Sequence, residues 1–312
     1  MDLRHLRYFQ AVAEEGHITR AAARLGIQQP PLSQQIKALE EELEVQLFRR
    51  LPRGVELTDA GEALLSDARR ILADVEAALA RVRRTARGEQ GRITIGFTSS
   101  APFHPFVPRV LSTFRKANPQ VSVALEEGGT AEMVADLQAE RLDAAFIRSA
   151  VPDHAGIAVF ELFEEPMVAA LPRGHRLARG RGRGPGQGRP PLALSDLAGE
   201  PVILYRRASG PGLFDAIIGA FHAAGAAPNV AQEAPRITAT LNLVAAGLGV
   251  TLVPQSLSAM RFEGVAYRPL AEAPRLAAPI RLACRINDHS AAARRFVALV
   301  RRAARQEGLA GG

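Results

Sequence analysis

The stretch at residues 18–43, ITRAAARLGIQQPPLSQQIKALEEEL, determines the fold of the first part of the chain. Thr19 is suited to cap a short helix over 20–25, and Gly26 offers the left-handed backbone that ends such a helix. A second helix is expected to begin near Pro30, because a proline in the first helical turn has no intrahelical N–H bond to lose. A short helix, a glycine turn and a second helix predict a helix-turn-helix.

The apolar positions of this second helix determine which of its side chains face outward. They follow one another at steps of four, three and four: Leu32, Ile36, Leu39 and Leu43. This spacing buries one helix face. Ser33, Gln34 and Lys37 are therefore expected on the exposed face.

The sequence on both sides of this pair completes a small domain over residues 1–57. Upstream, Leu3, Leu6, Phe9 and Val12 recur at helical spacing, and Gly16 is expected to end that helix. Downstream, the extended runs VQLF (45–48) and GVELT (54–58) flank a turn that contains Pro52 and Gly54. The runs predict a β-hairpin that carries Arg49, Arg50 and Arg53, and the whole predicts a winged helix-turn-helix.

Polar, basic and proline residues of this domain are candidate contacts to double-stranded DNA. They are Thr19, Arg20, Gln29, Pro30, Pro31, Ser33, Gln34, Lys37, Arg50 and Arg53. The start of a recognition helix enters the major groove, where Gln29 can bond adenine and the two prolines can touch a thymine methyl group. Lys37 and the wing arginines suit phosphates or a narrow minor groove. The alternative is that these are ordinary exposed residues of a helical scaffold.

Residues 58–90 are expected to form a linker and dimerisation helix. Thr58 is a plausible N-cap, and apolar residues follow at alternating steps of four and three: Leu64, Ala68, Ile71, Val75, Ala78 and Val82. This is a heptad seam, which a single long helix cannot bury by itself. The spacing therefore predicts that this helix pairs with a second copy of the chain.

Composition favours a soluble, cytoplasmic protein of several domains. The chain has 312 residues, of which 47% are hydrophobic and 23% charged, and no apolar run is long enough to span a bilayer. The N-terminus is charged from its second residue and lacks the apolar core of a signal peptide. The absence of both features predicts no membrane partner.

The net charge of +7 does not by itself indicate a nucleic-acid partner, because residues 1–90 hold fourteen basic and fourteen acidic residues. Most of the excess lies in residues 173–189, with six arginines and no acid. The Arg/Gly-rich segment 179–190 is interpreted as a solvated surface loop, with nucleic-acid contact as the alternative.

Cysteine and histidine usage excludes several kinds of site. Cys284 is the only cysteine, so the chain has no internal disulfide and no CxxC metal site. The histidines are scattered without metal-ligand spacing. The sequence therefore predicts no metal and no cofactor.

Residues 91–308 alternate strand and helix patterns, which is typical of an α/β domain. The pattern restarts after residue 160 and again near 265. We therefore expect two lobes, the first formed by 91–162 and 266–308 and the second by 163–265, as in periplasmic binding proteins. A cleft between two lobes is the usual place for a ligand.

Hydroxyl residues at the ends of predicted strands are candidate effector contacts. Ser99 and Ser100 follow the first strand of this domain, and Thr130 follows the next. Hydroxyls at the carboxyl edge of a parallel sheet, beside a helix N-terminus, can hold an anion. Thr238 begins a helix in the second lobe and could close the same cleft. The alternative is that these residues only cap helices.

Two larger side chains complete the candidate set, each with a structural alternative. Arg148 ends a strand and either contacts the effector or pairs with an acid. Tyr205 either lines the cleft or packs in the core.

The N-terminal pattern, from LRHLRYFQAVAEEGHITRAAARLGIQQPPLSQQ to VELTDAG, resembles the LysR-type transcriptional regulators almost position for position. The segments IGFTSSAPFHPFVPRVL, LDAAFIR, PVILYRR and LVAAGLGVTLVP resemble the effector domain of the branch that regulates benzoate and muconate catabolism. The resemblance covers nearly the whole chain.

The resemblance implies an effector-responsive DNA-binding regulator. It implies that Thr130 and Ser100, or its neighbour Ser99, contact the effector, and that Arg148 lies near a second effector site. It also implies a two-fold operator bound by a homotetramer built as a dimer of dimers, and it admits RNA polymerase as a further partner.

Two positions depart from the family pattern. Gln28 stands where Ser or Ala is common, and is a poorer N-cap. Gln34 stands where arginine is common, and glutamine favours adenine edges over guanine.

Three rival functions fit the sequence less well. A periplasmic solute-binding protein shares the two-lobed architecture but has no use for a helix-turn-helix. An enzyme is not favoured, because GxSxG, GxxxxGK[ST] and GxGxxG are all missing. A nucleoid protein would bind DNA without sequence preference. We therefore expect a sequence-specific transcription regulator whose effector is a small carboxylate, with aromatic acids among the candidates.

Overall fold

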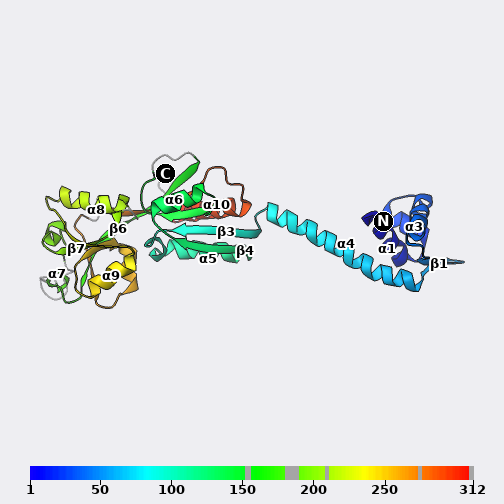
Figure 1. The fold of residues 1–312 in the computed structure, drawn as a ribbon, viewed down its shortest axis with the longest axis horizontal. Coiled ribbons are helices and arrows are strands. Elements are labelled where there is room, and N and C mark those ends of the chain that lie inside the picture. Colours follow the sequence, from blue (N-terminus) through cyan, green and yellow to red (C-terminus); the bar gives the residue numbers. More distant parts are fainter. Residues whose placement is uncertain (152–155, 180–189, 208–210, 273–275, 309–312) are drawn as a thin grey trace. The chain divides into compact units, whose positions relative to one another are not determined.

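The computed structural model describes residues 1–151, 156–179, 190–207, 211–272 and 276–308, and divides into two compact units, Met1–Arg84 and Thr85–Gly312 (Figure 1). Each unit is described by itself below. None of the helices in these ranges is long and apolar enough to cross a membrane. The segment 180–189, which holds most of the predicted Arg/Gly-rich loop, lies outside the described residues.

The first unit begins with the predicted helix-turn-helix. Its helices are α1 (Leu3–Glu15), α2 (Ile18–Leu25) and α3 (Gln29–Leu43). Gly16 and Gly26 end α1 and α2 with positive φ angles of 62° and 68°, as predicted. The expected N-cap of α2 was wrong. His17 caps this helix through a bond from the Thr19 backbone N–H to His17 Nδ1 (3.2 Å), and the helix therefore begins at Ile18.

The apolar stripe of α3 packs against α1 and α2. Leu32, Ile36 and Leu39 are buried in one core with Phe9 of α1, whereas Leu43 at the end of the helix is exposed. Three of the four predicted stripe residues are therefore buried. The first turn of α3 lies outside this core.

The wing is a two-stranded antiparallel hairpin of β1 (Phe48–Leu51) and β2 (Gly54–Leu57). The first strand begins three residues later than predicted. Glu40 Oε1 accepts the backbone N–H groups of Leu47 (2.8 Å) and Phe48 (3.0 Å), so the preceding segment is bound to α3 instead of extending the hairpin. The hairpin is docked on α1 by a bond from Val55 N–H to the Gly16 carbonyl (3.0 Å).

Helix α4 (Asp59–Ala86) follows the wing, and Thr58 caps it as predicted. Thr58 Oγ1 accepts the Gly61 N–H (3.0 Å) and donates to the Gln46 carbonyl (2.7 Å). The predicted heptad seam has two parts. Its first half, around the buried Ala68, covers the helix-turn-helix core, whereas Val82 near its end is 67% exposed.

The first lobe of the second unit is a mixed sheet covered by helices. Its strand order is β4-β3-β5-β11-β6, with β3 (Gln90–Phe97), β4 (Gln120–Glu127), β5 (Ala144–Ile147), β6 (Ile157–Pro172) and β11 (Ala277–Arg285). Strand β3 is parallel to β4 and β5, while β11 is antiparallel to β5 and β6. The lobe's helices are α5 (Phe106–Ala117), α6 (Thr130–Gln138) and α10 (Ala291–Gln306).

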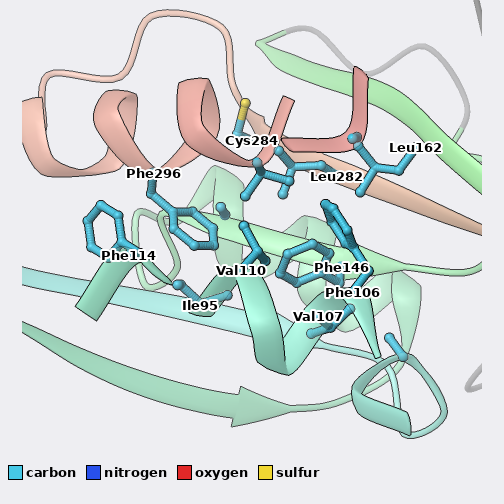
Figure 2. Packing of buried hydrophobic residues seen from close by; sticks show 14 of the residues in the cluster. Ile95, Phe106, Val107, Val110, Phe114, Phe146, Leu162, Leu282, Cys284 and Phe296 are labelled. Atoms are coloured by element: carbon cyan, nitrogen blue, oxygen red, sulfur yellow. The ribbon is translucent and has the colours of Figure 1, made fainter. Parts of the chain in front are cut away.

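Aromatic side chains fill the core of this lobe. Phe296 of α10 makes edge contacts with Phe114 (5.3 Å between centroids) and with Phe146 (6.2 Å), as Figure 2 shows from close by. In the same view the sulfur of Cys284 points away from these rings. Cys284 is buried, at 5% exposed.

The second lobe is built around β6, β9 (Thr251–Pro254) and β10 (Val265–Pro269), with the parallel pair β7 (Pro201–Tyr205) and β8 (Asn229–Ala234) joined to it through a bridge at Val202 and Val250. Its helices are α7 (Arg176–Arg179), α8 (Pro211–Ala223) and α9 (Ile237–Ala245). Short 3-10 turns in the described part of this unit include Ala101–Phe103, Leu194–Leu197 and Gln255–Met260.

Two strands, β6 and β11, carry the chain between the lobes instead of loops. Strand β6 runs without interruption for 16 residues, pairing first with β11 and then with β9 and β10. This strand therefore crosses the boundary expected between residues 162 and 163. The predicted return to the first lobe at residue 266 was also wrong, because β10 pairs with β6 from Pro172 to Val168 and belongs to the second lobe. The chain returns with β11.

The close approach of the wing to α1 yields a test of the first unit. Gly54 has a φ of 133°, and a Cβ there would lie 2.4 Å from the Gly16 carbonyl oxygen. We expect Gly54→Ala to lower the free energy of unfolding of this unit by about 1–3 kcal/mol, measured by urea unfolding with far-ultraviolet circular dichroism. Gly26→Ala is the control, because no atom lies within 4 Å of a Cβ at Gly26 and only its φ of 68° is strained. An equal loss in the two variants would contradict the predicted steric contact.

Candidate DNA and effector sites

The start of α3 and the wing present the candidate DNA contacts. Ser33 is half-buried and the other nine predicted residues are exposed. The N-cap residue of α3, Gln28, makes no side-chain bond to the backbone N–H groups of the first turn, as expected of a poorer N-cap. Gln29 Nε2 donates to Ser33 Oγ (2.8 Å), so these two side chains act as one polar pair.

The arginines of the wing differ in their ion pairs. Arg49 is 3.4 Å from Glu56 across the hairpin. Within the ranges that the structure describes, Arg50 and Arg53 have no carboxylate partner. A cation without a counter-ion is available to a phosphate. Lys37 is 3.3 Å from Glu41 on the solvent side of α3, an exposed pair that contributes little and that a phosphate can replace.

The second unit holds a cavity of about 290 Å³ between its two lobes. The first lobe contributes residues at the ends of β3, β4 and β5 and at the start of α6, and the second lobe contributes residues beside β7, α8 and α9. The lining residues are Thr98, Ser99, Ser100, Glu127, Gly128, Gly129, Thr130, Glu132, Arg148, Ser149, Tyr205, Leu213, Pro235 and Arg236. The structure thus brings five of the six predicted effector residues together.

The sixth predicted residue, Thr238, is exposed and does not line this cavity. Helix α9 begins at Ile237, whose side chain is buried, so the residues that face the cavity are the two that precede the helix, Pro235 and Arg236.

Three hydroxyl groups in the cavity wall are buried without a hydrogen-bond partner. They are Thr98 Oγ1, Thr130 Oγ1 and Ser149 Oγ, from three different strand ends of the first lobe. A buried polar group without a partner costs free energy. Their convergence on one cavity is the feature expected of a site that bonds a ligand. Of the three, only Thr130 was predicted, although Thr98 and Ser149 directly adjoin predicted residues.

Arg148 also lines the cavity, and its guanidinium is held in a hydrogen-bond network. Its guanidinium donates from Nε to Ser100 Oγ (3.1 Å), from Nη2 to the Ser100 carbonyl (3.2 Å) and from Nη1 to the Ala278 carbonyl (3.2 Å). It also pairs with Glu165 of β6, from Nη2 to Oε1 (2.7 Å). Both side chains are buried. The expected alternative, an arginine that pairs with an acid, is what the structure shows.

Glu165 extends the network into the second lobe. Its Oε2 accepts the Ser256 backbone N–H (2.7 Å) and its Oε1 accepts Ser256 Oγ (3.1 Å). Burial lowers the pKa of Arg148, and Glu165 opposes that shift, so the arginine stays charged in the neutral range. The pair therefore links the end of β5, both crossing strands and the 3-10 turn after β9.

Tyr205 and His104 flank this network. The Tyr205 hydroxyl donates to the Leu252 carbonyl (2.5 Å), and burial raises its pKa, so it remains a neutral hydrogen-bond donor. The His104 ring stacks 4.1 Å from the Phe163 ring. Burial lowers the pKa of His104, which keeps the ring uncharged near neutral pH.

An ion pair crosses the mouth of the cavity. Arg236 of the second lobe is 2.9 Å from Glu127 of the first. Glu132 turns back instead to accept the Gly129 N–H (3.3 Å) at the start of α6. Sequence reasoning missed Glu127 and Arg236, because only the fold shows that residues 109 positions apart face each other.

A helix-turn-helix with a wing in one unit and a small cavity between two lobes in the other define a DNA-binding regulator that responds to a small molecule. Comparison with known proteins agrees. Residues 3–62 match the bacterial regulatory helix-turn-helix protein, lysR family, and residues 86–305 match the LysR substrate binding domain. The chain belongs to the LysR family of bacterial transcriptional regulators.

Relatives match over nearly the full length. YnfL of Escherichia coli, described as an uncharacterized HTH-type transcriptional regulator, is 40% identical over 95% of this chain and 96% of its own. The structure of full-length CbnR complexed with its target DNA is 34% identical, with a TM-score of 0.81, over 97% of this chain and 100% of that chain. The effector binding domain of BenM with its effector benzoate is 28% identical, with a TM-score of 0.60, over 71% of this chain and 96% of that chain. BenM is a protein of Acinetobacter baylyi.

The buried ion pair behind the cavity yields a test of the second unit. Removing one partner leaves an unpaired buried charge, so Glu165→Ala is expected to lower the free energy of unfolding by about 3–5 kcal/mol. Urea unfolding of the full chain measures this loss. Glu161→Ala is the control on the same strand, because Glu161 forms a pair with Arg281 while 59% exposed and should lose at most about 1 kcal/mol. A loss at Glu165 no larger than at Glu161 would show that Arg148 does not depend on this partner.

Proposed function

We propose that this regulator reads a two-fold operator through α3 and the wing, and that a small carboxylate in the interlobe cavity changes its activity. The observation that carries the effector half is the set of three unpartnered hydroxyls at Thr98, Thr130 and Ser149. An anion whose oxygens accept from these groups would satisfy all three at once.

Electrostatics favour an anion with one charge over one with several. Thr130 stands at the start of the nine-residue helix α6, where the helix dipole is positive. The Arg148 guanidinium adds positive charge behind Ser100, although Glu165 offsets much of it. Glu127 is paired with Arg236, so Glu132 is the rim carboxylate that would repel a further negative group on the same ligand.

Size and shape limit the rest of the effector. A cavity of about 290 Å³ is at the small end of ligand pockets. Leu213, Pro235 and the Tyr205 ring contribute apolar surface on the second lobe. This combination suits a compact acid with an apolar body, and the benzoate bound by the similar domain of BenM is such an acid.

For the DNA end, we propose that the Gln29–Ser33 pair and Gln34 contact bases while Arg50 and Arg53 contact phosphates. This assignment is supported by the exposure of most of these side chains and by their place at the start of α3. It is also supported by the two wing arginines, which have no carboxylate partner among the described residues. The DNA complex of CbnR supports the same use of the N-terminal unit. The exposed end of the α4 seam supports dimerisation, which a two-fold operator requires.

An enzymatic function is not part of the proposal. The relatives are named as transcriptional regulators. Within the described part of the chain, no group of three or more His, Cys, Asp and Glu side chains could hold a metal ion.

Operator selection from genomic fragments, followed by footprinting with a panel of small acids, tests this function. We expect a short two-fold footprint whose protected length changes with one monocarboxylate and not with its amide. In Thr130→Val the same change should require about tenfold more acid, because a hydrogen bond to a charged group is lost.

The matched control is Thr238→Val, whose hydroxyl lies outside the cavity and whose response should equal that of the unchanged protein. Uniform protection of all DNA would contradict operator recognition. A footprint that responds equally in both variants would contradict the assigned effector site.

A further inference from the structure

A second cavity, of about 310 Å³, lies within the first lobe of the second unit and shares no residue with the interlobe cavity. Its walls come from the start of β6, the end of β11 with the residues after it, and α10 between Ala293 and Arg301. Small apolar side chains dominate the lining: Ala158, Cys284, Ala293, Val297 and Ala298. Neither the proposed effector contacts nor the fold's core uses this space.

One wall of this cavity is a cation stacked on an aromatic ring. The Arg301 guanidinium carbon lies 4.0 Å from the centroid of the Phe160 ring. A stacked guanidinium keeps its N–H groups in the plane parallel to the ring, where they can still form a bidentate bond to a carboxylate. The stacking also fixes the side chain before any ligand arrives, which reduces the entropy lost on binding.

Arg301 has no counter-ion in the described part of the chain, where no carboxylate lies within 4.0 Å of it. The other charged groups of the cavity are engaged. Arg285 pairs with Asp143 (3.1 Å) and Asp288 (2.7 Å), and Arg294 donates to the Asp288 carbonyl (2.6 Å). Arg294 also has no carboxylate partner among the described residues, but it is exposed, whereas Arg301 is half-buried and lies over the Phe160 ring.

We propose that this cavity is a second ligand site, for an aliphatic monocarboxylate whose carboxylate binds Arg301 and whose chain lies against Ala158, Val297 and Ala298. The half-buried Arg301 guanidinium offers one carboxylate a bidentate partner. The aliphatic lining selects an alkyl chain, because the Phe160 face is already covered by Arg301. The site does not depend on the interlobe cavity, so one molecule of the regulator could hold two different acids.

Cys284 provides a direct test, since it lines the cavity and is the only cysteine of the chain. Burial raises the pKa of its thiol to about 11, so its reaction with Ellman's reagent is slow and depends on access. Octanoate at ten times its dissociation constant should slow this reaction about tenfold. 1-Octanol, which has the chain without the charge, should protect far less.

Three variants of the full-length protein locate the binding. In Arg301→Gln, half-maximal protection should require about tenfold more octanoate or more, because a charged hydrogen bond is lost. Arg302→Gln is the matched control, since Arg302 is exposed on the same helix and does not line the cavity. Thr130→Val should leave the protection unchanged, which separates this site from the interlobe cavity. Thermal unfolding of each variant confirms that it is folded.

The proposal is overturned if octanoate fails to slow the reaction, or if octanol protects Cys284 as well as octanoate does. Equal protection in Arg301→Gln and Arg302→Gln would also overturn it. Loss of protection in Thr130→Val would show instead that octanoate binds between the lobes and slows the reaction by stabilising the fold.

Discussion

The ion pair between Arg148 and Glu165 is the constraint on which the second unit depends. Arg148 ends β5, and Glu165 lies in the middle of β6, the strand that passes from one lobe to the other. Through their remaining bonds they also hold Ser100, Ala278 and Ser256. A charged pair in a nearly dry interior is stable only when its geometry is satisfied on all sides, so these five segments must keep one arrangement.

This arrangement explains the unusual polarity of the cavity in front of the pair. Because Arg148 engages both the hydroxyl and the carbonyl of Ser100, it holds the segment after β3 at the cavity wall, to which it also contributes. The neighbouring hydroxyls of Thr98, Thr130 and Ser149 then have no protein partner. The first lobe is thereby organised without a ligand, and the second lobe forms the facing wall with Tyr205, Leu213 and Arg236. The Arg236–Glu127 pair at the mouth is exposed enough to open and close at little cost in free energy.

Sequence reasoning succeeded where the signal is local. Gly16 and Gly26 end helices because their positive φ angles suit glycine, and the α3 stripe is legible from its spacing. It failed where the deciding contact is distant or where two residues compete for one role. His17 takes the cap expected of Thr19, because an imidazole nitrogen can accept the same N–H. Neither the length of β6 nor the place of β10 could be predicted, since each is determined by pairing with strands far along the chain.

The central claim is that an acid bound between the lobes satisfies the hydroxyls of the first lobe and contacts the second. Hydrogen–deuterium exchange of the full chain, with and without the acid that alters the footprint, tests it most directly. The account predicts slower exchange at the backbone amides of 98–100, 129–132 and 236–237 together, because the ligand would bridge these segments. Protection confined to one lobe, or found only outside these segments, would contradict it.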